Sequence, residues 1–233
     1  MGTTIPRMRL PFAAAAAAAA AAVLLAAAGC TGGDGDGDLP AAGELLPAAA
    51  DEMAQLETVT VRIETDTDLA GLPLREVDGV ITRAGAAEGT ARVEQFGQLV
   101  EVGFVVLDGT FHYQLFGGWQ QLPLADATEF YDPSAILDSD RGLPQLLRTA
   151  TGATVVGRDG DTYEVTATLA AGGVAALLPG APDGLPATLW IGVDRPLLHR
   201  AQIEVPDGGS GGEAGTVSVE LSGFDQPVDI SAP

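Results

Sequence analysis

The sequence predicts an α+β protein built on one long antiparallel sheet of about ten strands, with three helical insertions. Many short segments alternate apolar and polar residues, which is the pattern of strands that bury one face. Turn signals such as Asp108-Gly109 follow each other closely along the chain. Neighbouring strands are therefore expected to pair as hairpins and not as βαβ units.

The first 30 residues have the composition of a secretory signal. Arg7 and Arg9 precede an apolar run that ends in Ala28-Gly29-Cys30, and Cys30 is the only cysteine in the chain. Small residues directly before a lone cysteine resemble a bacterial lipobox, in which the chain is cut before the cysteine and its thiol is acylated. A plain signal peptide or an uncleaved anchor helix is the alternative, because the run is close to the length that spans a membrane.

This interpretation divides the chain into three parts. Residues 1–29 are the expected lipoprotein signal peptide, 30–42 an acylated cysteine with a flexible Gly/Asp tether, and 43–230 the folded domain. The spaced aspartates of the tether do not form an EF-hand loop, which requires Gly at position six and Glu at position twelve. Counted from Asp34, these positions hold Leu39 and Leu45.

The charge of the chain excludes some partners. The formal net charge is −21, and removal of residues 1–29 would take away two arginines and no acid. Such a surface repels nucleic acid phosphates and is not expected to dock on anionic lipid headgroups. Membrane attachment is expected from acyl chains on Cys30, which would hold the protein outside the cytoplasm on the cell membrane.

The first half of the domain predicts one helix and five strands. Apolar residues at helical spacing, including Leu45, Leu46 and Met53, favour a helix over 43–57. Period-two alternation then begins at Val59-Thr60-Val61. Strands are expected over 59–63, 74–81, 91–94, 99–107 and 110–115, with turns at 69–74, 97–98 and 108–109 and a loop at 83–89.

The second half predicts short helices followed by further strands. Asp132-Pro133 is typical of a helix start, with a capping Asp before Pro at the first helical position. Leucines at helical spacing favour a second helix over Leu143–Thr149, and a small apolar helix is expected over 170–178. Strands are expected over 154–158, 163–169, 187–193, 198–205 and 216–224.

Several stretches, taken in order, resemble one family. They are Gly71-Leu72-Pro73-Leu74 with Asp78-Gly79-Val80, Phe104–Gly109 followed by a Tyr and Trp119, Tyr131–Leu137 followed by Gly142-Leu143, and Pro186–Ile191. Together with the lipobox, they resemble the actinobacterial cell-envelope lipoproteins of the LppX/LprA/LprF/LprG family, over residues 40 to 230. No single stretch is specific, but the ordered set is.

The resemblance implies a fold and a function. It implies a half-barrel similar to the LolA/LolB carriers, in which helices on the concave face of one curved sheet enclose an apolar cavity. It also implies that the cavity takes acyl chains of lipids, including triacylated glycolipids, lipoglycans or triacylglycerides, and that the protein carries them across the envelope. We expect the protein to be a monomer. An export pump is the implied partner in some cases. The negative charge favours a neutral or glycosylated lipid over an anionic one.

The candidate cavity residues are apolar side chains on the inward sides of the predicted strands and helices. An acyl-chain site needs such walls and no catalytic group. Tight packing of the helices on the sheet, with no cavity, is the alternative. Arg92 or Gln95 are candidates for polar contacts at a cavity mouth. The predicted wall residues are Ala91, Val93, Val100, Val102, Phe104, Phe111, Tyr113, Leu137, Leu143, Leu146 and Leu147.

The sequence gives little support to an enzyme, a metal or a cofactor. Gly208–Gly212 matches G-x-S-x-G, but a nucleophile elbow needs a strand before the serine and a helix after it, and here a strand follows. The two histidines, His112 and His199, lack motif partners, and the single cysteine is committed to acylation. Two alternatives to a carrier remain: a lipoprotein that scaffolds a transporter or cell-wall complex, and a hydrolase of envelope lipids.

Overall fold

A single antiparallel sheet of eleven strands runs through the described part of the protein. The computed structural model describes residues 39–66, 74–95, 97–127, 135–174, 177, 181–206 and 214–233. The expected signal peptide, Cys30 and most of the tether lie outside these residues. So do the expected turn at 69–73, the Asp132-Pro133 helix start and the 208–212 loop.

The strands pair with their neighbours in sequence, except at the centre of the sheet. The order is β6-β5-β4-β3-β2-β1-β11-β10-β9-β8-β7, so the first and last strands pair and the sheet has two free edges, β6 and β7. The strands are β1 (Thr58–Thr65), β2 (Leu74–Thr82), β3 (Ala87–Gln95), β4 (Gln98–Leu107), β5 (Thr110–Leu115), β6 (Gly118–Pro123), β7 (Thr151–Asp159), β8 (Thr162–Leu169), β9 (Leu185–Gly192), β10 (Leu198–Val205) and β11 (Gly215–Ser222).

The predicted single antiparallel sheet with helical insertions is confirmed, but individual elements differ: α2 (Leu124–Ala127) is not predicted, and the helix expected over 43–57 ends at Met53. The sequence does not predict β6, because only Leu122 in this strand is a large apolar residue on its inward side. Pairing with β5 forms the strand instead, with Gln114 opposite Trp119. The predicted loop at 83–89 is too long, since β3 already begins at Ala87.

Strand alternation gives the sheet an apolar face and a polar face. In β1, Val59, Val61 and Ile63 are buried, whereas Arg62 and Glu64 point to the other side. We call the side of the three apolar residues the inner face and the opposite side the outer face. The pairing register carries these two faces across all the strands, because residues directly opposite each other share a face.

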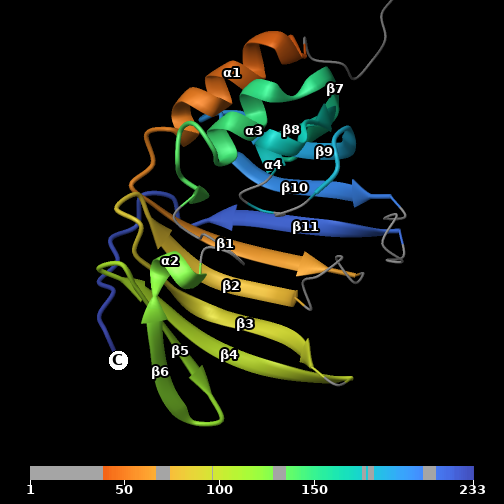
Figure 1. Cartoon of the computed structure of the whole chain (residues 1–233). Helices are drawn as coiled ribbons and strands as arrows, with labels where there is room; N and C mark the ends of the chain where they lie inside the picture. The colour runs from red at the N-terminus through yellow and green to blue at the C-terminus, as the bar shows by residue number, and fades with distance from the viewer. Residues whose placement is uncertain are drawn as a thin grey trace, which may run out of the picture. The chain divides into compact units, whose positions relative to one another are not determined.

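Helices cover the inner face at one end of the sheet. The helices are α1 (Ala42–Met53), α2 (Leu124–Ala127), α3 (Leu143–Thr149) and α4 (Ala171–Val174). Figure 1 shows α1, α3 and α4 gathered over β7–β9, whereas α2 lies near β5 and β6. An ion pair between Arg148 and Asp51, 3.0 Å apart, joins α3 to α1. The described residues contain no helix with the length and hydrophobicity needed to cross a bilayer.

Candidate functional site

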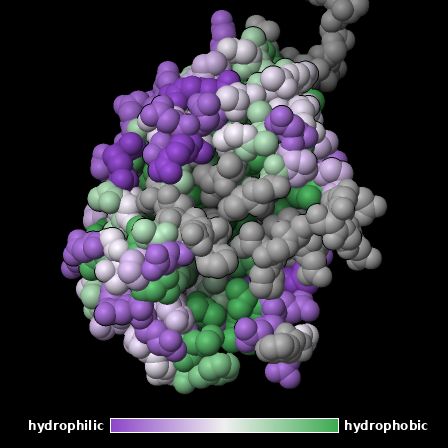
Figure 2. All heavy atoms as spheres, viewed as in Figure 1, coloured by the Kyte–Doolittle hydropathy of each residue, from purple (hydrophilic) through white to green (hydrophobic). Residues whose placement is uncertain are grey.

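The inner face is sealed at one end of the sheet and partly open at the other. On β8–β11 most of its side chains are buried, and Val165, Leu189, Ile203 and Val219 are fully so. On β3–β5 most inward residues are only half-buried, although Ala87 and Val106 are buried. Figure 2 shows strongly hydrophobic atoms gathered over this region, between rims of hydrophilic atoms. The open part of the inner face is therefore the candidate site.

The pairing register brings the seven predicted strand residues together on this face. Ala91 pairs with Val102, and Val93 pairs with Val100. In the next pair of strands, Phe104 lies opposite Tyr113. Phe111 lies opposite Val106, which shares the inner face with Phe104. Residues from three strands thus form one continuous apolar wall.

Three aromatic rings form a row along the wall. The ring centroids of Phe104 and Phe111 are 6.3 Å apart with nearly parallel planes, and those of Phe111 and Tyr113 are 6.1 Å apart. Both distances lie within the favourable range for aromatic pairs. The hydroxyl of Tyr113 donates a hydrogen bond to Oε1 of Gln120 at 2.9 Å, so its polar end is satisfied at the rim by β6. The row is an apolar surface with one polar end.

Two glycines that sequence reasoning does not assign to the site shape the wall beside Phe104. Gly79 and Gly89 lie opposite each other on β2 and β3, and Gly89 is also opposite Phe104. A Cβ on Gly79 would lie 3.3 Å from Cζ of Phe104 and 2.8 Å from the carbonyl oxygen of Glu88. The Phe104 ring therefore lies over bare backbone. A glycine inside a strand is the signal for such a close approach.

The four predicted helical leucines lie at the sealed end. Leu137, Leu143, Leu146 and Leu147 are fully buried in the main core cluster. Ala91, Phe104 and Phe111 pack against the same cluster as partly buried residues. The apolar interior is therefore continuous from the buried leucines to the open wall, although the leucines are not exposed themselves.

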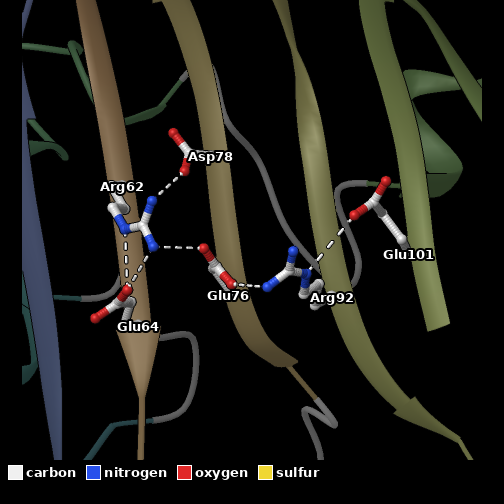
Figure 3. Close-up of polar contacts among 6 residues, drawn as sticks. All are labelled: Arg62, Glu64, Glu76, Asp78, Arg92 and Glu101. Atoms are coloured by element: carbon white, nitrogen blue, oxygen red, sulfur yellow. Dashed lines mark hydrogen bonds and ion pairs between the residues drawn. The ribbon is translucent and has the colours of Figure 1, made fainter. Parts of the chain in front are cut away.

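The outer face carries a network of paired charges instead (Figure 3). Arg62 contacts Glu64 and Glu76 at 2.7 Å and Asp78 at 2.8 Å, and the hydrogen bond to Glu64 raises the pKa of Arg62. Arg92 pairs with Glu76 at 2.8 Å and with Glu101 at 3.6 Å. Arg92 thus lies on the face opposite Ala91 and Val93, where it cannot act as a polar contact for the inner wall.

The same face holds an open hollow of about 380 Å³ near the ends of β1 and β2. Its lining is mainly polar and includes Glu64, Arg75 and Gln202. Arg75 is paired there with Glu94 at 2.6 Å. This lining suits water or a small polar molecule, and acyl chains would gain little in it.

The histidines have different surroundings. His112 lies on the outer face of β5, opposite Val105 of β4. The ring of His199 packs edge-on against Phe224 at 5.1 Å, and burial lowers the pKa of His199. Within the described ranges, no three His, Cys, Asp or Glu side chains are grouped so that they would hold a metal ion. The inner wall and the surroundings of the two histidines therefore favour the binding of apolar groups over catalysis.

Comparison with known proteins gives consistent matches. The model of the LppX_LprAFG lipoprotein family matches residues 41–230. The lipoarabinomannan carrier protein LprG of Mycolicibacterium hassiacum is 34% identical over 207 residues, which cover 84% of this chain and 86% of that protein.

Two crystal structures have a similar fold. LprF from Mycobacterium bovis superposes with a TM-score of 0.70 at 28% identity, covering 82% of this chain and 96% of that one. Lipoprotein LppX from Mycobacterium tuberculosis superposes with a TM-score of 0.59 at 26% identity, covering 81% and 99%.

Proposed function

The chain belongs to the LppX_LprAFG lipoprotein family, and we propose that it is a carrier that binds the acyl chains of a lipid or glycolipid on the open inner face. The acyl chains would lie along the wall of β3–β5 while the headgroup stays in water. The protein would then hand the lipid from one part of the cell envelope to the next.

The observation that carries this proposal is the half-buried apolar wall itself. Ala91, Val102, Phe104 and Phe111 present a contiguous apolar surface that the helices leave partly open among the described residues. Burial of each methylene contributes about 0.8 kcal/mol, so ten methylenes would contribute about 8 kcal/mol before the entropy cost of binding. The buried leucines Leu137, Leu143, Leu146 and Leu147 would form the closed end of the same interior.

The proposed ligand class is a neutral or glycosylated lipid, such as a triacylated glycolipid, a lipoglycan or a triacylglyceride. The name of the LprG relative, a lipoarabinomannan carrier protein, supports a glycosylated lipid. The formal charge of −21 supports a headgroup without strong negative charge, since like charges repel. If the purified protein extracted anionic phospholipids in preference to neutral lipids, this part of the proposal would fail.

No catalytic step is part of the proposed mechanism. The carrier name of the LprG relative and the apolar character of the wall both support binding without chemistry. We further propose that the protein is a monomer that works with an export pump. Cys30, outside the described residues, would bear the acyl chains that anchor it on the outer side of the cell membrane, with residues 30–42 as the tether.

A pair of adjacent substitutions tests the site. Ala91→Glu places a charge on the inner wall, whereas Thr90→Glu places the same charge on the outer face of the same strand. Lipid that co-purifies with the wild type, measured by native mass spectrometry and organic extraction, should remain with Thr90→Glu and be lost from Ala91→Glu. The milder Val102→Thr should show an intermediate loss if Ala91→Glu folds poorly.

Other outcomes would favour the alternatives. A folded Ala91→Glu variant that retains its lipid would exclude the wall as the site. A wild type that never carries lipid would favour a scaffold, and a time-dependent loss of acyl chains would indicate a hydrolase. Cys30→Ala should release the protein from the membrane and leave lipid loading intact, because the anchor and the site are separate.

A further inference from the structure

Exposed hydrophobic side chains gather at one end of the sheet. Phe116 is 86% exposed in the turn between β5 and β6, and Trp119 on β6 is 42% exposed. Trp119 lies opposite Gln114 of β5, close to the β5–β6 turn that carries Phe116. We call Phe116 and Trp119 the hairpin surface.

The β5–β6 hairpin has no charged residue of its own, in contrast to the rest of the chain. The sequence has no Asp, Glu, Arg or Lys between Asp108 and Asp126, although the whole chain has a formal charge of −21. The polar residues of β5 and β6 include three neutral glutamines, Gln114, Gln120 and Gln121. On the outer face, the neighbouring Glu101 is paired with Arg92 at 3.6 Å. The hairpin surface can therefore approach an apolar or anionic partner with less repulsion than other surfaces.

The backbone of the turn holds Phe116 outward at a conformational cost. Phe116 has a φ of 51° and Gly117 a φ of 86°. Positive φ in both central residues suits an Asn-Gly or Gly-Gly turn, and a bulky residue there is an outlier. Such outliers gather at functional positions, and an exposed aromatic ring at this one contributes no core packing that would offset its cost.

Trp119 is held on the outer face near the same turn. Its Cη2 atom lies 3.7 Å from the position that a Cβ on Gly103 would occupy, so the indole spans from β6 across β5 to β4. Phe111 and Tyr113 come from the same hairpin but lie on the inner face, in the aromatic row. Aromatic side chains thus surround the hairpin on both faces and at its tip.

We propose that the hairpin surface inserts into the interface of a lipid bilayer. Amphipathic aromatic side chains such as Trp favour the headgroup level of a membrane, and Phe favours the acyl boundary below it. The neutral hairpin avoids the repulsion that the rest of this acidic protein would meet. Since the hairpin continues into the open inner wall, this contact would bring the wall to the membrane. The contact itself does not require a lipid in the wall.

Tryptophan fluorescence tests the proposal directly, because the chain has two tryptophans, Trp119 and Trp190. Trp190→Phe leaves Trp119 as the reporter, and Trp119→Phe leaves Trp190, which lies on the outer face under Arg200. The full chain is mixed with phosphatidylcholine vesicles whose acyl chains carry bromine, a short-range quencher. We expect quenching of Trp119 and not of Trp190, and weaker quenching when anionic phosphatidylglycerol is added.

Matched variants identify the contact. In the Trp190→Phe background, Phe116→Ser should weaken binding to the vesicles. The vesicle concentration that gives half-maximal quenching of Trp119 should rise about tenfold. Val156→Ser removes another exposed hydrophobic side chain, 51% exposed on the opposite edge strand β7, and should have no effect. Both positions are exposed, so neither change should prevent folding, which circular dichroism will verify.

Three results would overturn the proposal: no quenching of Trp119, equal quenching of both tryptophans, or equal effects of Phe116→Ser and Val156→Ser. A concentration-dependent spectral shift of Trp119 without vesicles, with a dimer on size exclusion, would instead assign the hairpin to a second copy pairing at the free edge of β6. Ala91→Glu should still show Trp119 quenching, so a failure of the lipid site is distinguishable from a failure of this proposal.

Discussion

At the residue scale, the absence of side chains matters as much as their presence. Gly79 and Gly89 face each other across β2 and β3, and the ring of Phe104 occupies the space above them. A larger side chain at Gly79 would meet the Phe104 ring, and one at Gly89 would meet the backbone of Asp78 and Gly79. The aromatic row of the inner wall therefore depends on two residues that provide no apolar surface of their own.

Gly89→Ala should destabilise the protein by about 1–3 kcal/mol, the usual cost of overpacking. The added Cβ would clash with the carbonyl oxygen of Asp78 and lie 2.6 Å from Cα of Gly79. Gly157→Ala is the matched control, because it also lies inside a strand but has nothing within 4 Å of its Cβ position. Urea unfolding measures both variants, and equal free energies of unfolding would contradict this account of the wall.

His199 should give the protein a small pH dependence of stability. Burial lowers the pKa of His199 in the folded state from 6.5, so the unfolded chain binds the proton more tightly. Stability is then fully present above pH 6.5 and declines as the pH falls toward the lower folded pKa. Because the ring is partly exposed, the loss should stay below about 1 kcal/mol.

The measurement for His199 compares urea unfolding at pH 7.5 and pH 5.5 in the wild type and in His199→Gln. Asp138 and Asp225 stay ionised in this range, since hydrogen bonds from backbone amides lower their pKa values from 3.8. The variant should lose less stability on acidification than the wild type. An identical loss in both would show that another group is responsible.

At the element scale, local sequence patterns predict most strands, but they do not predict which strands pair when the two are distant in the sequence. The alternation of Val59, Val61 and Ile63 correctly predicts β1, and the positive φ of Asp108 and Gly109 fits the turn that their sequence predicts. No local signal indicates that Val61 pairs with Leu221 to join the two halves of the sheet. The Gln-rich β6 is also missed, because its partner strand and not its own pattern makes it a strand.

Arg195 connects three elements that are distant in the sequence. It lies in the turn between β9 and β10, and it pairs with Glu52 of α1 at 2.8 Å and with Asp225 after β11 at 3.2 Å. Asp225 also accepts a hydrogen bond from the backbone N–H of Glu57 at 2.9 Å. Together these contacts hold α1 and the segment after β11 near the turn.

Arg195→Gln should therefore lower the free energy of unfolding by about 1 kcal/mol, since both ion pairs are partly exposed. Arg158→Gln is the matched control, because Arg158 donates its hydrogen bond within its own hairpin, to the carbonyl oxygen of Gly160. Urea unfolding at low salt should separate the two variants, and high salt should narrow the difference. No difference at low salt would argue against this connection.

At the scale of the whole molecule, the candidate site follows from where the helices pack. Alternation assigns Ala91, Val102 and Phe104 to one face from the sequence alone. Their partial exposure arises because α1, α3 and α4 pack at the other end of the sheet. No local sequence pattern predicts where these helices pack. For the same reason, the helical leucines are sealed in the core and the strand residues are not.

This asymmetry predicts different local stabilities along one sheet. Amides of β9 and β10, under the helices, should exchange with solvent only through global unfolding, whereas amides of β3–β5 should also exchange through local opening. Under the proposed function, lipid loading should increase protection in β3–β5, because a ligand stabilises only the conformations that bind it. Protection in β9 and β10 should change only as far as global stability does.

Hydrogen exchange measured by mass spectrometry on the delipidated and the lipid-loaded protein checks this last prediction, with Ala91→Glu as the control that should gain no protection. The difference between the two ends of the sheet is informative, because non-specific association with lipid would protect exposed amides wherever they lie. Equal gains over both ends, or a gain confined to β8–β10, would move the ligand away from the open wall. A gain in β3–β5 that Ala91→Glu abolishes would instead tie the local opening of these strands to the binding of acyl chains.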